Sequence, residues 1–191
     1  SSAASDVYKR QDEYTFNHSV NVCTLSLSLA GRMGMKRKEL ETIGIGALLH
    51  DIGKLVIGSY IDRYFKLIQE KTDREEIAFV TAEKAVLGID HTELGAAVLA
   101  KWGFPAELVT VAKWHHQPGR ADEHRDLVDL VHLADVISMM MGIGIGFDGL
   151  QYIPSADSMS RLGLKTESLE LVACRTIEAV EEITEMFENS R

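Results

Sequence analysis

The segment ALLHDIGK, residues 47–54, ends a run in which apolar residues recur every three or four positions from about residue 38. This spacing predicts a helix over 38–51 with one apolar face. A histidine and an aspartate, His50 and Asp51, stand where that helix ends. Buried imidazole and carboxylate groups both need polar partners, and one divalent cation can serve both. The segment therefore predicts a buried helix that delivers His50 and Asp51 to a metal site.

The same kind of placement recurs along the rest of the chain. His18 interrupts an apolar helix face, His91 lies in the first turn of a predicted helix, and the pair at 115–116 ends another. Asp135 stands inside the apolar run LVHLADVIS, residues 130–138. Sets of imidazole and carboxylate groups without thiolates suit iron, manganese, zinc or nickel better than calcium. We expect these residues to share one metal site: His18, His50, Asp51, His91, His115, His116 and Asp135.

Composition and charge restrict the partners of this chain. Its 191 residues are enough for one hydrophobic core, and 46% of them are hydrophobic. The 20 Lys and Arg against 29 Asp and Glu give a net charge of −9, which argues against broad contact with a nucleic-acid backbone or an anionic membrane. There are two cysteines, and no apolar run is long enough to span a membrane. We expect a cytoplasmic protein with reduced thiols.

Helical periodicity runs through almost the whole chain, and no segment alternates as a strand would. We expect an all-α fold, one compact domain of about seven to nine helices over residues 13–191, after a disordered lead-in at 1–12. Thr72 with Glu75, and likewise Asp90 with Glu93, have the spacing of a capping box and predict a helix start at each place. The first helix is predicted to turn one stripe to the core: Phe16, Val20, Cys23, Leu27 and Ala30. The predicted helices span about 13–34, 38–51, 61–70, 72–88, 90–103, 105–115, 126–141 and 166–189, with one short helix before the last.

Taken together, these motifs resemble the HD superfamily of metal-dependent phosphohydrolases. The first half, NHSVNV followed by ALLHDIGK, is similar to the HD-GYP family of cyclic-dinucleotide phosphodiesterases. The second half, from LGIDHTELGAAVLAKWGFPAELVTVAKWHHQPG to LVHLAD, is closer to the HDOD family of bacterial signalling domains. The resemblance covers about residues 13–150, and HDIGK together with the paired histidines is its most specific part.

The resemblance implies a centre of two divalent metal ions, iron or manganese, with nickel, zinc or magnesium as further options. His18, His50, Asp51 and Asp135 would hold the first ion. Asp51 would bridge to a second ion held also by His91, His115 and His116. Two such ions can share a hydroxide of lowered pKa and neutralise charge on a phosphoryl group.

Two further residues have open roles. Lys54, one turn beyond the doublet, would join Asp51 in catalysis by contacting a phosphate oxygen or assisting the leaving group; the alternative is a solvated residue at a helix end. His132 lies three residues before Asp135, on the same helix face. It is either a hydrogen-bond partner in the second shell of a metal ligand or a plain buried histidine.

The sequence departs from the family pattern in two places. The glutamate that precedes the first histidine by four residues in tri-metal members is Tyr14 here, which favours two ions over three. The Gly-Tyr-Pro signature after the paired histidines is replaced by QPGRADEHRD, residues 117–126, which argues against a cyclic dinucleotide as substrate.

Trp102 and Trp114 are expected to pack in the core, with stacking on a base as the alternative.

Two functions follow from these observations. The first is a phosphohydrolase of the phosphodiesterase or nucleotide phosphatase type, acting on a phosphorylated nucleotide-like small molecule in bacterial signalling. The second is a non-catalytic HDOD-type regulatory domain that binds signalling proteins through its glutamate-rich last helix or through residues 142–153. A di-iron protein with Glu-x-x-His ligands fits less well, because that pair does not occur in the sequence.

Overall fold

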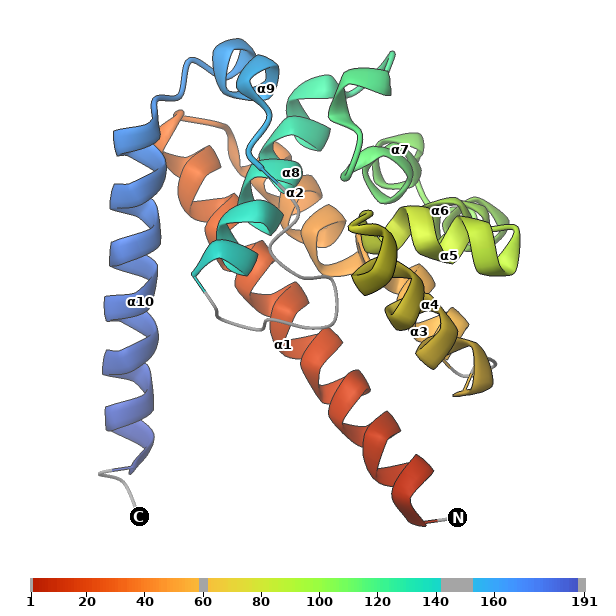
Figure 1. The fold of residues 1–191 in the computed structure, drawn as a ribbon. Helices are drawn as coiled ribbons and strands as arrows, with labels where there is room; N and C mark the ends of the chain where they lie inside the picture. Colours follow the sequence, from red (N-terminus) through yellow and green to blue (C-terminus); the bar gives the residue numbers. More distant parts are fainter. Residues whose placement is uncertain (1, 59–61, 142–152, 189–191) are drawn as a thin grey trace.

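The computed structural model describes residues 2–58, 62–141 and 153–188 (Figure 1). Every element in these ranges is a helix, which confirms the all-α prediction. Residues 142–152, one of the contact surfaces expected for a regulatory domain, lie outside the described ranges. No described helix is long and apolar enough to cross a membrane. The helices in chain order are α1 (Ser2–Arg32), α2 (Arg37–Leu49), α3 (Ile52–Gly58), α4 (Asp62–Glu75), α5 (Phe79–Leu87), α6 (His91–Lys101), α7 (Ala106–Trp114), the short 3-10 helix η1 (Pro118–Arg120), α8 (Arg125–Met140), α9 (Ala156–Arg161) and α10 (Thr166–Glu188).

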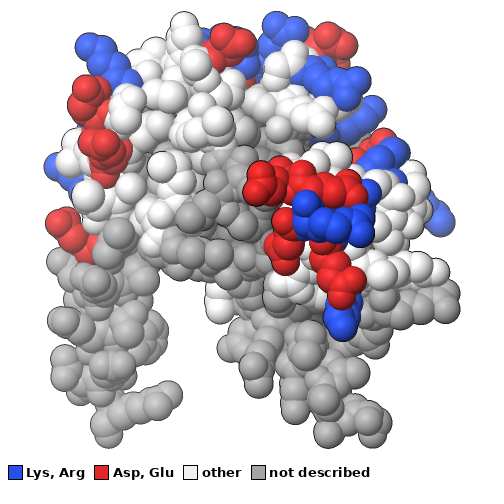
Figure 2. Space-filling view, in the orientation of Figure 1, with Lys and Arg blue, Asp and Glu red and all other residues white. Residues whose placement is uncertain are grey.

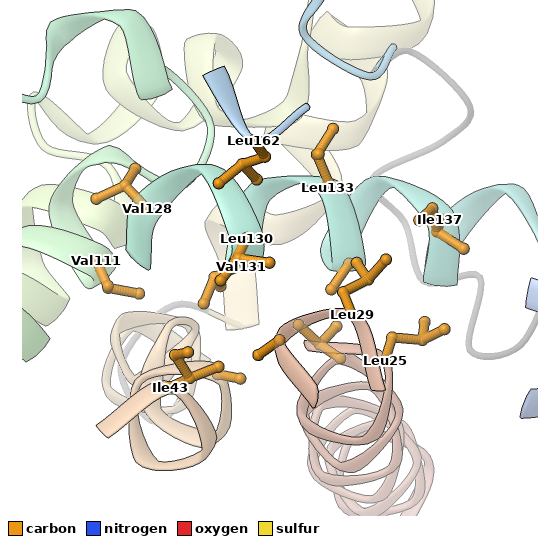
Figure 3. Close-up of a cluster of buried hydrophobic side chains, with 14 of the residues drawn as sticks. Leu25, Leu29, Ile43, Val111, Val128, Leu130, Val131, Leu133, Ile137 and Leu162 are labelled. Atoms are coloured by element: carbon orange, nitrogen blue, oxygen red, sulfur yellow. The ribbon is translucent and has the colours of Figure 1, made fainter. Parts of the chain in front are cut away.

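The main core forms where α8 crosses α1 and α2 (Figure 3). Leu25 and Leu29 of α1 and Ile43 of α2 point toward α8, and each is at most 1% exposed. Between Val128 and Met139 every residue of α8 is buried. Full burial of one such aliphatic side chain contributes about 1.5–3 kcal/mol, so this crossing fixes α8 firmly against the first two helices.

Helix α1 buries only part of the predicted stripe, since Ala30 lies in the core and Cys23 packs partly against it. Phe16 is 67% exposed and Val20 is 39% exposed, whereas His18, Val22 and Leu25 are buried. The two stripes are adjacent on the helix, and both repeat at helical spacing, so periodicity alone does not separate them. The stripe that the structure buries includes His18, whose imidazole lies 2.9 Å from Asp135.

The start of α1 also differs from the prediction. Helix geometry begins at Ser2, where a disordered lead-in was expected over 1–12. No glycine or proline stands between Ser2 and Gly31, and a helix extends at low cost once its later turns have formed. The placement of the domain boundary near residue 13 stays a prediction.

The capping box predicted at Thr72 and Glu75 is wrong. Thr72 is buried inside α4, which ends only at Glu75, and the chain reverses at Glu76 in the left-handed region with φ 52°. The ion pair between Lys71 and Glu75, one helical turn apart, supports the continued helix. By contrast, the cap predicted at Asp90 is confirmed, because its side chain accepts a hydrogen bond from the Glu93 amide at 2.9 Å.

Helix α3 lies very close to α6 at Gly53. A Cβ atom at this position would be 1.9 Å from the His91 carbonyl oxygen and 2.9 Å from the Gly95 nitrogen. Only glycine permits this approach without moving one of the two backbones. The contact brings the turn after α2 against the first turn of α6, where His50, Asp51 and His91 stand.

Candidate metal centre

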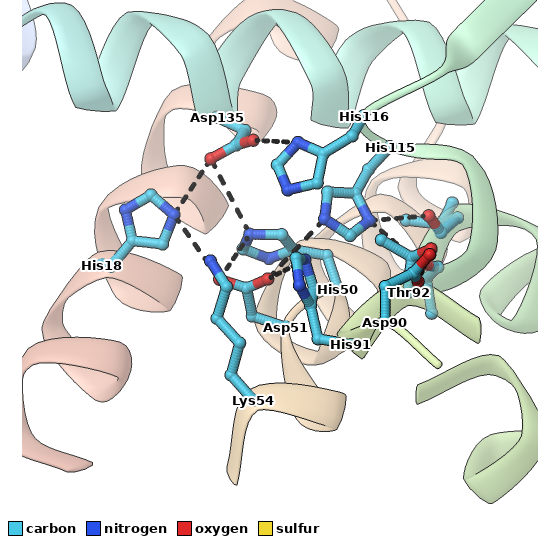
Figure 4. Close-up of polar contacts among 12 residues, drawn as sticks. His18, His50, Asp51, Lys54, Asp90, His91, Thr92, His115, His116 and Asp135 are labelled. Atoms are coloured by element: carbon cyan, nitrogen blue, oxygen red, sulfur yellow. Dashed lines mark hydrogen bonds and ion pairs between the residues drawn. The ribbon is translucent and has the colours of Figure 1, made fainter. Parts of the chain in front are cut away.

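The predicted ligand residues come together between α1, α8 and the ends of α2, α6 and α7 (Figure 4). His18 projects from α1 and Asp135 from α8. His50 and Asp51 occupy the turn between α2 and α3, and His91 is the first residue of α6. The pair at 115–116 directly follows α7. Their side chains are at most 4% exposed, so seven polar groups share a buried cluster.

Asp51 is at the centre of one half of this cluster. The Nε2 atoms of His50, His91 and His115 lie 3.5, 3.5 and 3.6 Å from its carboxylate oxygens. These distances are long for direct hydrogen bonds. Donor atoms bound about 2.1 Å from one cation lie roughly 3–3.5 Å apart, so the spacing suits atoms that share a metal.

Hydrogen bonds on the outer side of the rings orient two of these imidazoles. The Nδ1 atom of His50 donates to the Ala47 carbonyl at 2.6 Å, and that of His115 donates to the Ala112 carbonyl at 3.0 Å. A proton on Nδ1 leaves the lone pair on Nε2, which faces Asp51. Among the described residues, these two buried Nε2 atoms have no hydrogen-bond partner.

The third imidazole, His91, is oriented by a carboxylate that the sequence analysis missed. Glu83 of α5 is 1% exposed, and its Oε2 atom lies 2.5 Å from His91 Nδ1 and 3.0 Å from the His91 amide nitrogen. A carboxylate behind a ligand histidine fixes the ring and makes Nε2 a stronger donor to a metal. The available signal was an acidic residue on the apolar face of a helix, eight positions before the histidine.

A second group of side chains gathers around Asp135. His18 Nε2 lies 2.9 Å from Asp135 Oδ1, His50 Nε2 lies 3.9 Å from the same oxygen, and His116 Nδ1 lies 3.5 Å from Oδ2. The structure thus contains two groups whose potential ligand atoms lie within 4.8 Å of one another: Asp51, His91, His115 and His116, and then His18, His50 and Asp135. Buried nitrogen and carboxylate donors in two adjoining groups fit divalent transition-metal ions.

The charges of the cluster follow from burial and from neighbouring groups. Burial lowers the pKa of His50 to about 4, and burial with the nearby His115 lowers the pKa of His116 well below its usual range. Burial alone would raise the pKa of Asp51, but the Lys54 ammonium and the His50 imidazole hold it far below the usual value. At neutral pH the His50 and His116 imidazoles are therefore neutral and the Asp51 carboxylate is ionised, which are the forms that bind metals.

His18 and His91 differ from the other histidines. Burial works against their charged forms, yet hydrogen bonding to Asp135 and its charge raise the pKa of His18 overall. The Glu83 carboxylate likewise outweighs burial and raises the pKa of His91. Each of these imidazoles thus lies beside a carboxylate that balances a positive charge, whether that charge is a proton or a bound cation.

The two residues with open roles both lie at the cluster. Lys54 Nζ is 2.9 Å from Asp51 Oδ2, and its side chain is 11% exposed, so it is not a solvated residue at a helix end. His132 is 3% exposed, and its Nδ1 donates to the His115 carbonyl at 2.7 Å, while its Nε2 accepts from the Ser155 amide at 3.2 Å. His132 thus holds the backbone of a predicted ligand residue, and both of its ring nitrogens bond to backbone groups and not to a ligand side chain.

Comparison with known proteins agrees with this geometry. The HDOD domain model matches residues 2–118, which is more than half of the chain. The chain belongs to the HDOD domain family. This HDOD domain also resembles a crystal structure of an HDOD domain protein of unknown function from Geobacter sulfurreducens, with a TM-score of 0.70 and 22% identity over 88% of this chain and 59% of that one.

Two curated relatives of the HDOD domain are named as phosphodiesterases. Cyclic di-GMP phosphodiesterase PA4108 of Pseudomonas aeruginosa is 43% identical over 49 residues, which are 26% of this chain and 12% of the relative. Cyclic-di-AMP phosphodiesterase PgpH of Bacillus subtilis is 31% identical over 102 residues, 53% of this chain and 13% of the relative. The similarity therefore extends over a small part of each of these longer proteins.

Proposed function

We propose that this HDOD domain is a metal-dependent phosphohydrolase with a two-metal centre, acting on a phosphodiester or phosphomonoester of a nucleotide-like molecule. The observation that carries the proposal is the convergence of three imidazole Nε2 atoms on the buried Asp51 carboxylate at 3.5–3.6 Å. Two of these rings are oriented by backbone carbonyls and the third by Glu83. The names of the two phosphodiesterase relatives support the substrate class.

In this proposal Asp51 would contribute to the sites of both cations. His91, His115 and His116 would help to hold one cation, and His18, His50 and Asp135 would help to hold the other. When bound, two divalent cations lower the pKa of water and neutralise charge on a phosphoryl group. The chain's own contribution is to hold the donors in fixed orientations, through the Glu83 carboxylate and the backbone carbonyls behind the rings.

Lys54 is the cationic group of the chain that reaches this carboxylate. Its ammonium lies 2.9 Å from Asp51 Oδ2 in the structure. A flexible point charge with three donors can move from a carboxylate to a phosphate oxygen and can give a proton to the leaving oxygen. We assign Lys54 to these steps, so its removal should lower turnover and leave the bound metal in place.

The test combines metal analysis with a generic substrate. Protein purified anaerobically without chelator or histidine tag should contain about two equivalents of iron, manganese or a similar metal and should hydrolyse bis-p-nitrophenyl phosphate. The variant His50→Asn should lose both properties. The matched control is His124→Asn, a histidine outside the cluster in the left-handed conformation that asparagine tolerates. Metal-loaded protein that hydrolyses no aryl or nucleotide phosphate would contradict the proposal.

A second function, a non-catalytic regulatory domain, is favoured by one observation. The Gly-Tyr-Pro signature of the phosphodiesterase branch is absent, and η1 with its flanking loop takes its place. This alternative expects one structural metal or none, no turnover, and a stable complex with a signalling protein. The metal analysis and the aryl phosphate assay therefore separate the two functions.

A further inference from the structure

A cavity of about 390 Å³ adjoins the metal centre on the side of His116. Its walls come from α5, the start of α6, the end of α7 and η1, and His116 is the residue that it shares with the metal cluster. A ligand in this cavity therefore lies directly beside one of the two candidate cation sites. Its other walls carry an aromatic ring and several charges, which the metal centre does not use.

The indole ring of Trp114 is the centre of one wall. The Lys113 ammonium lies 4.8 Å from the ring centroid, and the Arg120 guanidinium carbon lies 5.2 Å from it. Arg120 also donates to the Gln117 side-chain oxygen at 3.0 Å. These contacts hold two positive charges at the cavity through uncharged partners, because cation–π and amide contacts neutralise no charge.

The opposite wall carries charges of both signs, one cation and two carboxylates. The Lys84 ammonium forms an ion pair with Glu93, and the Asp90 carboxylate accepts hydrogen bonds from the Thr92 hydroxyl and the Glu93 amide. In the part of the chain that the structure describes, no carboxylate forms an ion pair with Lys113 or Arg120. Three cations and two carboxylates line the cavity, so its lining has one net positive charge, in a chain whose net charge is −9. Lys113 and Arg120 can therefore attract an anion into the cavity.

We propose that this cavity binds a second phosphate group of a nucleotide-like substrate whose reacting phosphate lies at the metal centre. The inference rests on the proposed function, which it makes more specific. The planar fork of Arg120 suits two phosphate oxygens at once, and Lys113 adds a mobile charge beside it. A substrate with two phosphates, such as a linear dinucleotide with a 5′-phosphate, reaches both places; a substrate with one phosphate reaches only the metal centre.

The proposal also gives the altered loop a role. Gln117 and Arg120 belong to the segment QPGRADEHRD that stands where the Gly-Tyr-Pro signature would be. In this chain that segment forms η1 and presents the Arg120 guanidinium to Trp114 and the cavity. We infer that the departure from the phosphodiesterase pattern changes which phosphorylated molecule is preferred, toward one with a free second phosphate.

Binding to the metal-free chain tests the inference without relying on catalysis. The chain contains two tryptophans, and Trp102 is 63% exposed at the end of α6, so Trp102→Phe leaves Trp114 as the fluorescent reporter of the cavity. The ligands are the linear diadenylate pApA, which has two phosphates, and ApA, which has one. We expect pApA to change Trp114 fluorescence and to bind about tenfold more tightly than ApA, because it adds charge-assisted hydrogen bonds.

Matched variants identify the residues that make this difference. The double variant K113A/R120A should bind pApA and ApA equally, whereas K113R/R120K should retain most of the preference. The control R37A/K66A removes the same charge from side chains that are 94% and 83% exposed on other helices, and its preference should equal that of the parent. Equal binding of the two ligands to the parent chain, or an undiminished preference in K113A/R120A, would overturn the inference.

The same measurements keep the inference apart from the proposed function. If the chain prefers pApA but hydrolyses no phosphate ester after metal loading, the proposed phosphate site is supported and the proposed activity is contradicted. If the chain hydrolyses bis-p-nitrophenyl phosphate but shows no preference for pApA, the proposed activity is supported and the proposed phosphate site is contradicted.

Discussion

At the scale of single residues, Asp51 is the group on which both halves of the cluster depend. Four polar atoms from His50, Lys54, His91 and His115 lie 2.9–3.6 Å from its two oxygens. The variant Asp51→Asn keeps the shape of the side chain but removes the charge that two cations would share. We expect the metal content, measured by elemental analysis, to fall from about two equivalents to less than one. An unchanged metal content would show that Asp51 does not bridge.

Glu83 should act on the metal through His91. Loss of a carboxylate behind a ligand histidine typically costs about 10- to 100-fold in metal affinity, so we expect that loss for Glu83→Ala in a competitive chelator titration. Glu83→Gln keeps an acceptor for His91 Nδ1 and should be affected less. The matched control is Glu93→Gln, a 40% exposed carboxylate on the neighbouring helix that does not contact His91. Equal affinities for all three variants would mean that Glu83 only fills space.

The sequence predicted the residues of the site better than the surroundings that hold them. Each predicted ligand shows a local conflict, a polar group on an apolar face or at a helix end, and such conflicts are visible without a fold. Glu83 carries the same signal, an acidic residue on an apolar helix face, but its histidine partner is not visible in the sequence. Gln117 lacks the signal, because a glutamine in a polar loop is ordinary there. Their roles depend on the packing of α5 and η1 against α6 and α7, which only the tertiary structure specifies.

At the scale of elements, the limits of the sequence concern which face of a helix is buried. Two apolar stripes on α1 compete, and the structure buries the one with Val22 and Leu25 while Phe16 stays 67% exposed. The choice is made by α8, whose nearly complete burial requires partners along its length. Helix positions were predicted well wherever a local stop signal exists: Gly88 and Gly103, which have positive φ, follow helices that end as expected.

The close approach of α3 to α6 gives a prediction at this scale. In Gly53→Ala the new Cβ would be 1.9 Å from the His91 carbonyl oxygen, so one backbone must move. We expect a loss of about 1–3 kcal/mol in the free energy of unfolding, measured with urea. Metal binding should also weaken, because the shift moves the turn that holds Asp51 away from His91.

The matched control for this substitution is Gly44→Ala in α2. Its Cβ would meet only side-chain atoms at 3.6–3.7 Å, which is ordinary contact. Alanine also has the higher helix propensity, so this variant should be unchanged or up to about 1 kcal/mol more stable. If Gly53→Ala were as stable as Gly44→Ala, the backbone contact between α3 and α6 would not be a constraint on the fold.

At the scale of the whole molecule, the site is assembled from helices that are far apart in the sequence. Folding brings α1, which contributes His18, next to α8, which contributes Asp135. The turn that holds Asp51 lies between these two helices and α6 (Figure 4). On the one face that Figure 2 shows, acidic and basic side chains are intermixed. The titratable groups of the cluster are buried, so the stability of the chain should respond to their protonation.

The free energy of unfolding of the metal-free chain should therefore fall as the pH drops below about 6.5. The pKa of His50 is about 4 in the folded chain against 6.5 when unfolded, so between these values only the unfolded chain binds the proton, and acid favours unfolding. The lowered pKa values of His116 and His132 act in the same direction. His18 and His91, whose pKa values are raised, stabilise the folded chain as the pH falls towards 6.5 and add almost no slope below about pH 6. Urea unfolding is therefore compared at pH 6 and pH 5, where His50 alone should make a difference of about 1 kcal/mol, since each pH unit within its window contributes at most about 1.4 kcal/mol. The difference should shrink in His50→Asn and persist in His124→Asn, and equal stability of the parent chain at the two pH values would contradict a buried neutral cluster.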